Sequence, residues 1–274
     1  MQFIPLAKAL GAEVVDIDLT KELDTISKGT LKSGLLEHQV IYFRDQNITS
    51  KQQLDLAEVF GEAVIHPAYP QDKEVPEVNI LINDKDRPSK IELWHTDMTF
   101  MKCPPLGSIL RAEKIPDFGG DTLFASMSAA FEGLSDKMQS FLSGLTAIHD
   151  FSYGFKESLA EPGGKERLKQ AVIDNPPVEH PVIRTHPLSK KKGLFVNCLF
   201  TKNIVGLKQK ESDTLLKMLY SHMVLPEYTF RLKWEKDSIA FWDNRITQHK
   251  PINDYFPKYR EMHRITIKGD KPFY

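Results

Sequence analysis

Residues 263–268 read H-R-I-T-I-K, and their polarity alternates from one residue to the next. His263, Ile265 and Ile267 fall on one face of such a segment, with the more polar residues between them on the other. Because successive side chains of a strand point to opposite faces, the pattern predicts a β-strand. Further short runs bounded by turn residues predict strands at 14–18, 40–43, 181–184, 193–196 and 238–242.

Helical periodicity occupies fewer segments than strand patterns do. We expect helices at 27–38, 49–60, 135–142 and 211–223, the second of them capped by Thr49 and Ser50. Many short strands with a few outer helices favour a mainly β fold, a sandwich or jelly roll, over a parallel α/β sheet. No glycine-rich nucleotide-binding motif is present, and we expect residues 1–274 to form a single domain.

The composition argues against partners that are bound by charge. Lys and Arg total 36 and Asp and Glu total 37, so the formal net charge is −1. We therefore expect neither nucleic acid nor a membrane as a partner. The start of the chain lacks the pattern of a signal peptide, and Cys103 and Cys198 show no metal-binding spacing. A cytoplasmic location is the resulting expectation.

The strongest chemical signal is W-H-T-D-M-T at residues 94–99. If this stretch is a strand, His95 and Asp97 present an imidazole and a carboxylate on the same face. A pair of this kind occurs by chance in many proteins, so it needs a third ligand. His249 is the best candidate, and two histidines with one carboxylate form the facial set of non-haem Fe(II) oxygenases.

Arg260 and Arg264 follow His249 and make this hypothesis stronger. An oxygenase that uses a 2-oxo acid needs a cation for the acid's distal carboxylate, and arginine binds carboxylates as a bidentate fork. Thr122, directly after the glycine turn of residues 119–121, offers a hydroxyl for the same purpose. The alternative for both arginines is an ordinary solvated surface charge.

Seven motifs occur in an order that resembles the taurine/2-oxoglutarate dioxygenase family, and most closely its taurine dioxygenases. They are W-H-T-D-M-T-F (94–100), P-P-L-G-S-I-L (104–110), G-G-D-T-L (119–123), H-P-V-I-R-T-H-P (180–187), F-V-N (195–197), W-D-N-R-I-T-Q-H (242–249) and M-H-R-I-T-I-K-G-D-K-P-F-Y (262–274). The resemblance implies a double-stranded β-helix, or jelly roll, with Fe(II) at one end and 2-oxoglutarate as cosubstrate. It also suggests a homo-oligomer.

The resemblance assigns roles to individual residues. It implies that His95, Asp97 and His249 bind the iron and that Thr122 and Arg260 hold 2-oxoglutarate. It implies that a small anionic substrate, of the sulfonate type, is bound by the following six residues: His66, Tyr69, Phe100, Phe155, Phe200 and Arg264. For the aromatic residues the alternative is ordinary core packing.

The implied reaction uses O2 to hydroxylate the carbon next to sulfur in taurine or a related alkylsulfonate. Sulfite, an aldehyde, succinate and CO2 are then released. Two positions depart from the taurine enzymes, since Ile91 replaces an asparagine and Gly154 replaces a serine. The expected substrate is therefore a sulfonate-type anion more than taurine itself.

Three alternatives remain open from the sequence. The same chemistry could act on an alkyl sulfate ester, an aryloxy acid or another small anion. The chain could instead be a jelly-roll binding protein that has kept the metal site and lost turnover. A zinc hydrolase fits less well, because H-E-x-x-H is absent. Polar stretches within residues 70–93 raise the further hypothesis of a mobile lid.

Overall fold

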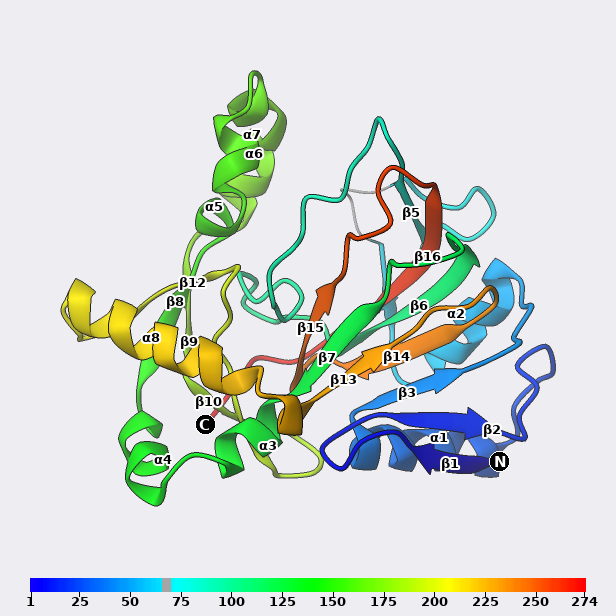
Figure 1. Cartoon of the computed structure of the whole chain (residues 1–274), viewed down its shortest axis with the longest axis horizontal. Helices are drawn as coiled ribbons and strands as arrows, with labels where there is room; N and C mark the ends of the chain where they lie inside the picture. Colours follow the sequence, from blue (N-terminus) through cyan, green and yellow to red (C-terminus); the bar gives the residue numbers. More distant parts are fainter. Residues whose placement is uncertain (66–69) are drawn as a thin grey trace.

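The computed structural model describes residues 1–65 and 70–274, and two facing β-sheets form its centre (Figure 1). Within the described residues the larger sheet has eight strands. Its spatial order is β1 (Gln2–Pro5), β2 (Ala12–Val15), β3 (Val40–Phe43), β14 (Ile239–Asp243), β6 (Gly107–Lys114), β16 (Arg260–Ile267) and β4 (Ala63–Val64), and β5 (Asn79–Asn83) also pairs with β16.

A three-stranded sheet lies opposite and consists of β13 (Thr229–Leu232), β7 (Thr122–Ser126) and β15 (Thr247–Pro251). Buried side chains from both sheets form one apolar cluster, to which Phe124 of β7, Trp242 of β14 and Met262 of β16 belong. Two sheets packed on a shared apolar interior are the jelly-roll arrangement. The predicted fold class is therefore confirmed, and the order of its strands makes the interior of this roll the place where distant segments meet.

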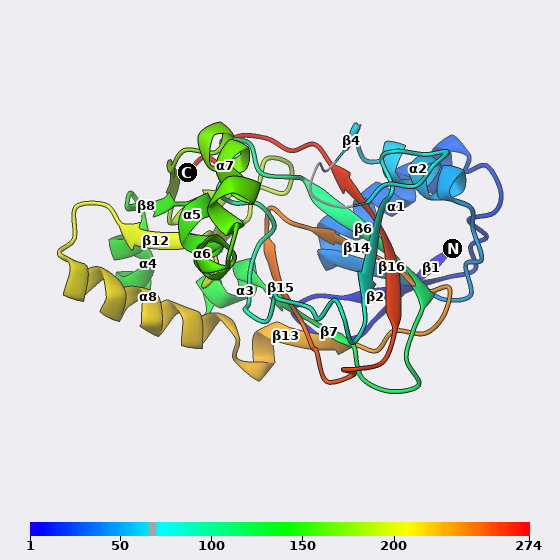
Figure 2. The same cartoon turned by 90° about the horizontal axis from the view of Figure 1, so that it is seen from above.

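The outer face of the larger sheet is covered by α1 (Thr25–His38) and α2 (Ser50–Glu58), as Figure 2 shows from above. A second buried cluster joins Leu31 and Leu56 of these helices to Ile265 and Ile267 of β16. Met262 faces the interior cluster instead, so the alternation of residues 263–268 separates a helix-facing row from an interior-facing row. Arg260 and Arg264 share the interior parity of Met262.

The opposite end of the molecule is a mixed lobe of helices and small sheets, which holds a third apolar cluster. It contains the sheet β12–β8–β9, the hairpin β10–β11 and most of the helices. The helices are α3 (Met127–Glu132), α4 (Asp136–Leu142), α5 (Phe151–Gly154), α6 (Lys156–Ala160), α7 (Gly164–Asp174), α8 (Gln209–Met223) and the 3-10 helix η1 (Pro226–Tyr228). The strands are β8 (Thr146–His149), β9 (Val178–Pro181), β10 (Ile183–Thr185), β11 (Lys192–Leu194) and β12 (Thr201–Ile204).

Most of the predicted elements are present, with shifted ends. The strand expected at 40–43 is β3, and Thr49 caps α2 through a capping box with Gln52. The strand expected at 14–18 ends earlier, at Val15, because Asp16 adopts a left-handed conformation with φ of 57°. The strand expected at 181–184 is interrupted between Pro181 and Ile183, and its two parts pair with different neighbours.

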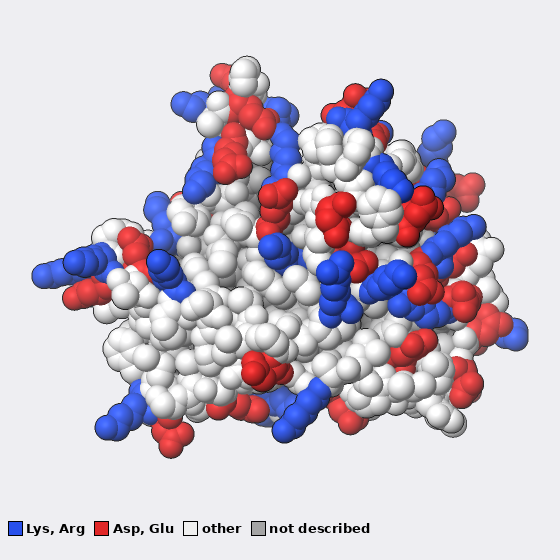
Figure 3. All heavy atoms as spheres, viewed as in Figure 1, with Lys and Arg blue, Asp and Glu red and all other residues white. Residues whose placement is uncertain are grey.

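Charged side chains of both signs are interspersed over the face shown in Figure 3, in keeping with the balanced composition. Among the helices of residues 1–65 and 70–274, none is both long enough and apolar enough to cross a membrane.

Gly107 allows β6 to approach β14 closely. A Cβ atom at this position would lie 2.4 Å from the carbonyl oxygen of Trp242 and 2.6 Å from the ring of Phe241. We expect Gly107→Ala to lower the free energy of unfolding by about 1–3 kcal/mol, because backbone or core atoms must shift. Urea unfolding monitored by circular dichroism measures this change.

Gly29→Ala is the matched control, because no heavy atom lies within 4 Å of the Cβ it would add. Gly29 is exposed in α1, so alanine there should raise the free energy of unfolding by up to about 1 kcal/mol. A Gly107→Ala protein as stable as the wild type would contradict this account of the packing between β6 and β14.

Candidate active site

His95, Asp97 and His249 come together in the interior, between segments far apart in the sequence. The Nε2 atom of His95 lies 3.7 Å from Oδ1 of Asp97, and Nε2 of His249 lies 3.9 Å from the same oxygen. One donor atom from each residue lies within 4.8 Å of the other two, and all three side chains are buried. Two imidazoles and one carboxylate at this spacing can hold one divalent transition metal ion.

The local structure at His95 differs from the predicted strand. His95 makes an isolated antiparallel bridge with His249, in which each residue's N–H donates to the other's carbonyl, at 3.0 and 2.9 Å. The chain then turns at Asp97, and Met98 has a φ of 49°. The predicted convergence of the two side chains is correct, but a bridge followed by a turn produces it. His249 lies in β15, the strand that follows β14, and β14 is the strand predicted at 238–242.

The protonation of the two histidines suits metal binding. Nδ1 of His95 lies 2.9 Å from the carbonyl oxygen of Leu93, and because a carbonyl only accepts, Nδ1 carries the proton. The lone pair of His95 is therefore on Nε2, which faces Asp97. Burial lowers the pKa of His95, and burial together with the neighbouring His95 lowers the pKa of His249 to about 3. Both rings are neutral at pH 7, the form in which imidazole binds metals.

Asp97 uses its second oxygen to contact two further side chains. Ser108 donates a hydrogen bond to Oδ2 at 3.2 Å, and Nη2 of Arg264 lies 3.1 Å from the same oxygen. Burial alone raises the pKa of this carboxyl group, but Arg264 and then His249 and His95 outweigh it and hold the pKa below its usual range. Asp97 is therefore ionised, with Oδ1 directed at the two histidines.

Arg264 is thus placed beside the metal-binding group, and it is mostly buried. Its Nε atom is buried and has no hydrogen-bond partner among residues 1–65 and 70–274. A guanidinium in such a position retains donors for an additional anion. The structure thus brings this predicted residue to the metal-binding group. Ser108, a short polar residue inside the strand β6, was not among the predicted residues.

Arg260 occupies the other end of the interior-facing row of β16. Its guanidinium is buried, and the Cζ atom lies 5.7 Å from the ring centroid of Tyr255. Burial lowers the pKa of Arg260. Its Nε is buried without a hydrogen-bond partner in the described part of the chain. A Cβ atom at Gly120 would lie 3.2 Å from this Nε, so Arg260 packs against the turn that precedes Thr122. Such a buried cation with an unused donor suits a carboxylate ligand.

Thr122 begins β7 directly after this turn, in which Gly119 and Gly120 have φ values of 77° and 74°. Its hydroxyl accepts a hydrogen bond from the indole N–H of Trp234 at 2.9 Å. An indole can only donate, so the proton of the Thr122 hydroxyl remains free for an anion. The sequence carries no signal for Trp234, because the contact joins residues that are far apart along the chain.

Three predicted aromatic residues form one cluster. The ring centroid of Phe100 lies 4.9 Å from that of Phe200 and 6.3 Å from that of Phe155. Phe151, which sequence analysis did not identify, is the fourth ring and lies 5.1 Å from Phe100. Its position four residues before Phe155, within a helical turn, is the signal that could have identified it.

The two positions that depart from the taurine enzymes have structural consequences. At Gly154 a Cβ atom would lie 2.4 Å from Cδ1 of Phe200, so the absence of a side chain lets this ring pack against the backbone. The carbonyl of Ile91 accepts a hydrogen bond from the side chain of Asn253 at 3.1 Å. Asn253 thereby ties the segment before His95 to the chain that follows β15.

His66 and Tyr69 lie outside the described residues. The neighbouring segment 70–93 contains β5, which pairs with β16, and Lys90 in it forms an ion pair with Glu161 at 2.6 Å. Apart from β5, residues 70–93 form no further helix or strand.

Comparison with known proteins identifies the family. A family profile described as "Taurine catabolism dioxygenase TauD, TfdA family" matches residues 2–266. The alkylsulfatase of Acinetobacter baylyi is 36% identical, over 98% of this chain and 86% of that protein. The alpha-ketoglutarate-dependent sulfate ester dioxygenase of Pseudomonas putida is 33% identical, over 98% and 89%.

Among solved structures, a taurine dioxygenase from Burkholderia xenovorans is 36% identical and superimposes with a TM-score of 0.85, covering 99% of this chain and 90% of that one. The match extends over nearly the whole chain, in sequence as in structure. Together with the buried His-Asp-His group, these findings show that the chain belongs to the TauD/TfdA family of Fe(II)- and 2-oxoglutarate (alpha-ketoglutarate)-dependent dioxygenases.

Proposed function

We propose that this enzyme hydroxylates the carbon next to sulfur in taurine or a related alkylsulfonate, with 2-oxoglutarate and O2 as cosubstrates. The product, a 1-hydroxysulfonate, collapses to an aldehyde and sulfite, and 2-oxoglutarate becomes succinate and CO2. The observation that carries this proposal is the buried His95–Asp97–His249 group with the cation of Arg264 3.1 Å from Asp97. This contact supports the proposal, because a guanidinium suited to a sulfonate lies next to the candidate metal site.

His95, Asp97 and His249 would hold the iron through two neutral imidazoles and one ionised carboxylate. Bound Fe(II), with 2-oxoglutarate and O2, supplies the oxidising power that converts the C–H bond to C–OH. The protein positions the metal ligands. Ser108 and Arg264 contact Oδ2 of Asp97, which keeps Oδ1 directed at the metal site.

Arg260 and Thr122 would bind the distal carboxylate of 2-oxoglutarate. The guanidinium is buried with an unused N–H, and the threonine hydroxyl keeps its proton available because it accepts from Trp234. Charge-assisted hydrogen bonds of this kind are strong in a site that excludes water. They would hold the 2-oxo acid by its distal end and leave its keto end available to the metal.

Arg264 would bind the anionic end of the substrate, with His66 as a second partner. Phe100, Phe155 and Phe200, with Tyr69, would form the wall around the alkyl chain and exclude water. The contact between Arg264 and Asp97 supports this arrangement, because an anion bound by Arg264 would lie close to the residues that would hold the metal.

A sulfate ester is the second candidate substrate. Two relatives at 36% and 33% identity are an alkylsulfatase and a sulfate ester dioxygenase. Hydroxylation of the carbon attached to the ester oxygen would release an aldehyde and sulfate, where a sulfonate releases sulfite. The apolar side chain of Ile91 also favours an uncharged alkyl chain over the ammonium group of taurine, because it offers no hydrogen-bond acceptor.

We further propose that residues 1–274 work as one domain in a homo-oligomer in the cytoplasm, without nucleic-acid or membrane partners. The match of one family over residues 2–266 supports a single domain. The net charge of −1 offers no attraction for nucleic acid or an anionic membrane. Size-exclusion chromatography with light scattering measures the molar mass in solution, which we expect to be a multiple of the mass of one chain.

Asp97→Ala tests the metal ligands. We expect it to abolish substrate-dependent succinate formation and to weaken Mn(II) binding by more than about tenfold, since the only carboxylate of the His95–Asp97–His249 group is lost. Calorimetric titration with Mn(II) and chromatographic analysis of succinate measure the two effects. Asp55→Ala, an exposed carboxylate on α2, is the control and should match the wild type. Full succinate formation by Asp97→Ala would refute the ligand assignment.

A substrate panel separates the two candidate substrates. With Fe(II), 2-oxoglutarate and O2 present, we expect butane- or hexanesulfonate to be turned over faster than taurine, with equal amounts of sulfite and succinate. Alkyl sulfates would give sulfate in place of sulfite. A clear preference for taurine would contradict the effect we assign to Ile91. Failure of every panel member to stimulate succinate formation would contradict the substrate class.

Trp234→Phe tests how Thr122 is oriented. We expect the KM for 2-oxoglutarate to rise about fivefold, corresponding to roughly 1 kcal/mol for the lost hydrogen bond, while kcat changes less. Thr122→Val should raise this KM at least as much, and Thr122→Ser should stay near the wild type. An unchanged KM in Trp234→Phe would show that the indole does not orient the hydroxyl.

A further inference from the structure

Asn244 contacts the main chain of Asp97 from the turn that joins β14 to β15. The N–H of Asp97 donates to Oδ1 of Asn244 at 2.8 Å, and Nδ2 of Asn244 donates to the carbonyl of Asp97 at 3.1 Å. The same Nδ2 also donates to the carbonyl of Pro105 at 3.1 Å. One buried carboxamide thus pairs with both polar backbone groups of the metal-binding aspartate.

These contacts replace the hydrogen bonds that a strand would have provided. The ladder between His95 and His249 ends before Asp97, where the chain turns and Met98 takes a positive φ. Buried backbone groups need partners, and without the carboxamide both groups of Asp97 would lose theirs. Asn244 thus fixes the backbone from which the Asp97 side chain leaves, while Ser108 and Arg264 contact its carboxylate.

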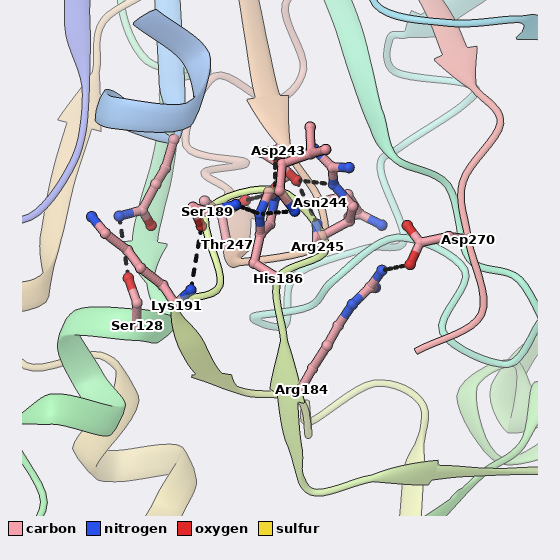
Figure 4. A network of polar contacts seen from close by, with 12 residues as sticks. Ser128, Arg184, His186, Ser189, Lys191, Asp243, Asn244, Arg245, Thr247 and Asp270 are labelled. Atoms are coloured by element: carbon pink, nitrogen blue, oxygen red, sulfur yellow. Dashed lines mark hydrogen bonds and ion pairs between the residues drawn. The ribbon is translucent and has the colours of Figure 1, made fainter. Parts of the chain in front are cut away.

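The turn that carries Asn244 is itself held by a network of polar contacts, as Figure 4 shows. The carboxylate of Asp243 accepts hydrogen bonds from Nε and Nη2 of Arg245, at 2.8 and 2.6 Å, and lies 3.0 Å from Nε2 of His186. The main-chain N–H of Asn244 donates to the carbonyl of Leu106 at 2.8 Å. All of these side chains are buried, and the strand β15 that leaves the turn carries His249.

We propose that Asn244 is a positioning residue for the metal site. It holds the backbone of Asp97 to the turn that precedes β15, and it thereby aligns Asp97 with His249. The inference rests on the metal-binding role of Asp97 in the proposed function. It assigns Asn244 no contact with substrate or metal. Loss of such an indirect contact typically weakens metal binding by ten- to a hundredfold.

The test compares Asn244→Asp and Asn244→Ala with Gln46→Ala. Gln46 is a matched control, because its buried carboxamide also accepts one main-chain N–H, from Leu19, and donates to two carbonyls, of Ile17 and Arg44. It lies outside the active site. Each full-length protein is titrated with Mn(II) by calorimetry, the bound Mn(II) is examined by electron paramagnetic resonance, and unfolding in urea is measured without metal.

We expect both Asn244 variants to raise the Kd for Mn(II) about tenfold or more and to change the resonance of the bound ion. Gln46→Ala should lose stability while its Kd stays within about twofold of the wild type. Asn244 variants that bind Mn(II) as the wild type does would overturn the inference. Failure of both to fold would also overturn it, because the carboxamide would then serve the fold and not the metal site.

The wild-type titration separates this inference from the proposed function. If the wild type binds no Mn(II), the proposed metal site fails, and the inference fails with it. If the wild type binds Mn(II) and only the comparison of variants fails, the metal site stands without the role we assign to Asn244.

Discussion

The two main-chain hydrogen bonds between His95 and His249 are the interaction on which the site depends. They are the whole of the ladder between the segment of residues 94–100 and β15. They bring two imidazole rings to a centroid distance of 4.2 Å. The turn at Asp97 then brings a carboxylate oxygen to 3.7 and 3.9 Å from their Nε2 atoms. A metal site from segments distant in the sequence requires such a fixed crossing point, because a shift of register would turn the side chains away from one another.

The strand β16 connects this site with the core. Its residues alternate between a row that packs under α1 and α2 and a row that faces the interior of the roll. Ile265 and Ile267 bury apolar surface in the first row. In the second row, Arg260 and Arg264 carry positively charged guanidinium groups. The apolar row holds the strand in register. The guanidinium of Arg264 is thereby kept beside Asp97, and that of Arg260 is kept against the turn that precedes Thr122. The stability of the fold and the chemistry of the site thus depend on the same alternation.

Much of this could be predicted from local patterns. The alternation of residues 263–268, the cap at Thr49 and the convergence of His95, Asp97 and His249 were all correctly predicted. The turn at Asp97 could not be predicted, because its backbone is held by Asn244, which lies far away in the sequence. The hydrogen bond from Trp234 to Thr122 and the packing of Phe200 on Gly154 also depend on tertiary contacts that no local pattern encodes.

The most direct test of the central claim is a reaction under ¹⁸O2 with Fe(II), 2-oxoglutarate and a sulfonate or sulfate ester that the enzyme turns over. Mass spectrometry of the succinate reports the fate of the oxygen. We predict one ¹⁸O atom in each succinate formed and none in the released sulfite or sulfate. We also predict rapid formation of succinate only when the substrate is present. Unlabelled succinate, or labelled succinate formed at the same rate without substrate, would contradict it.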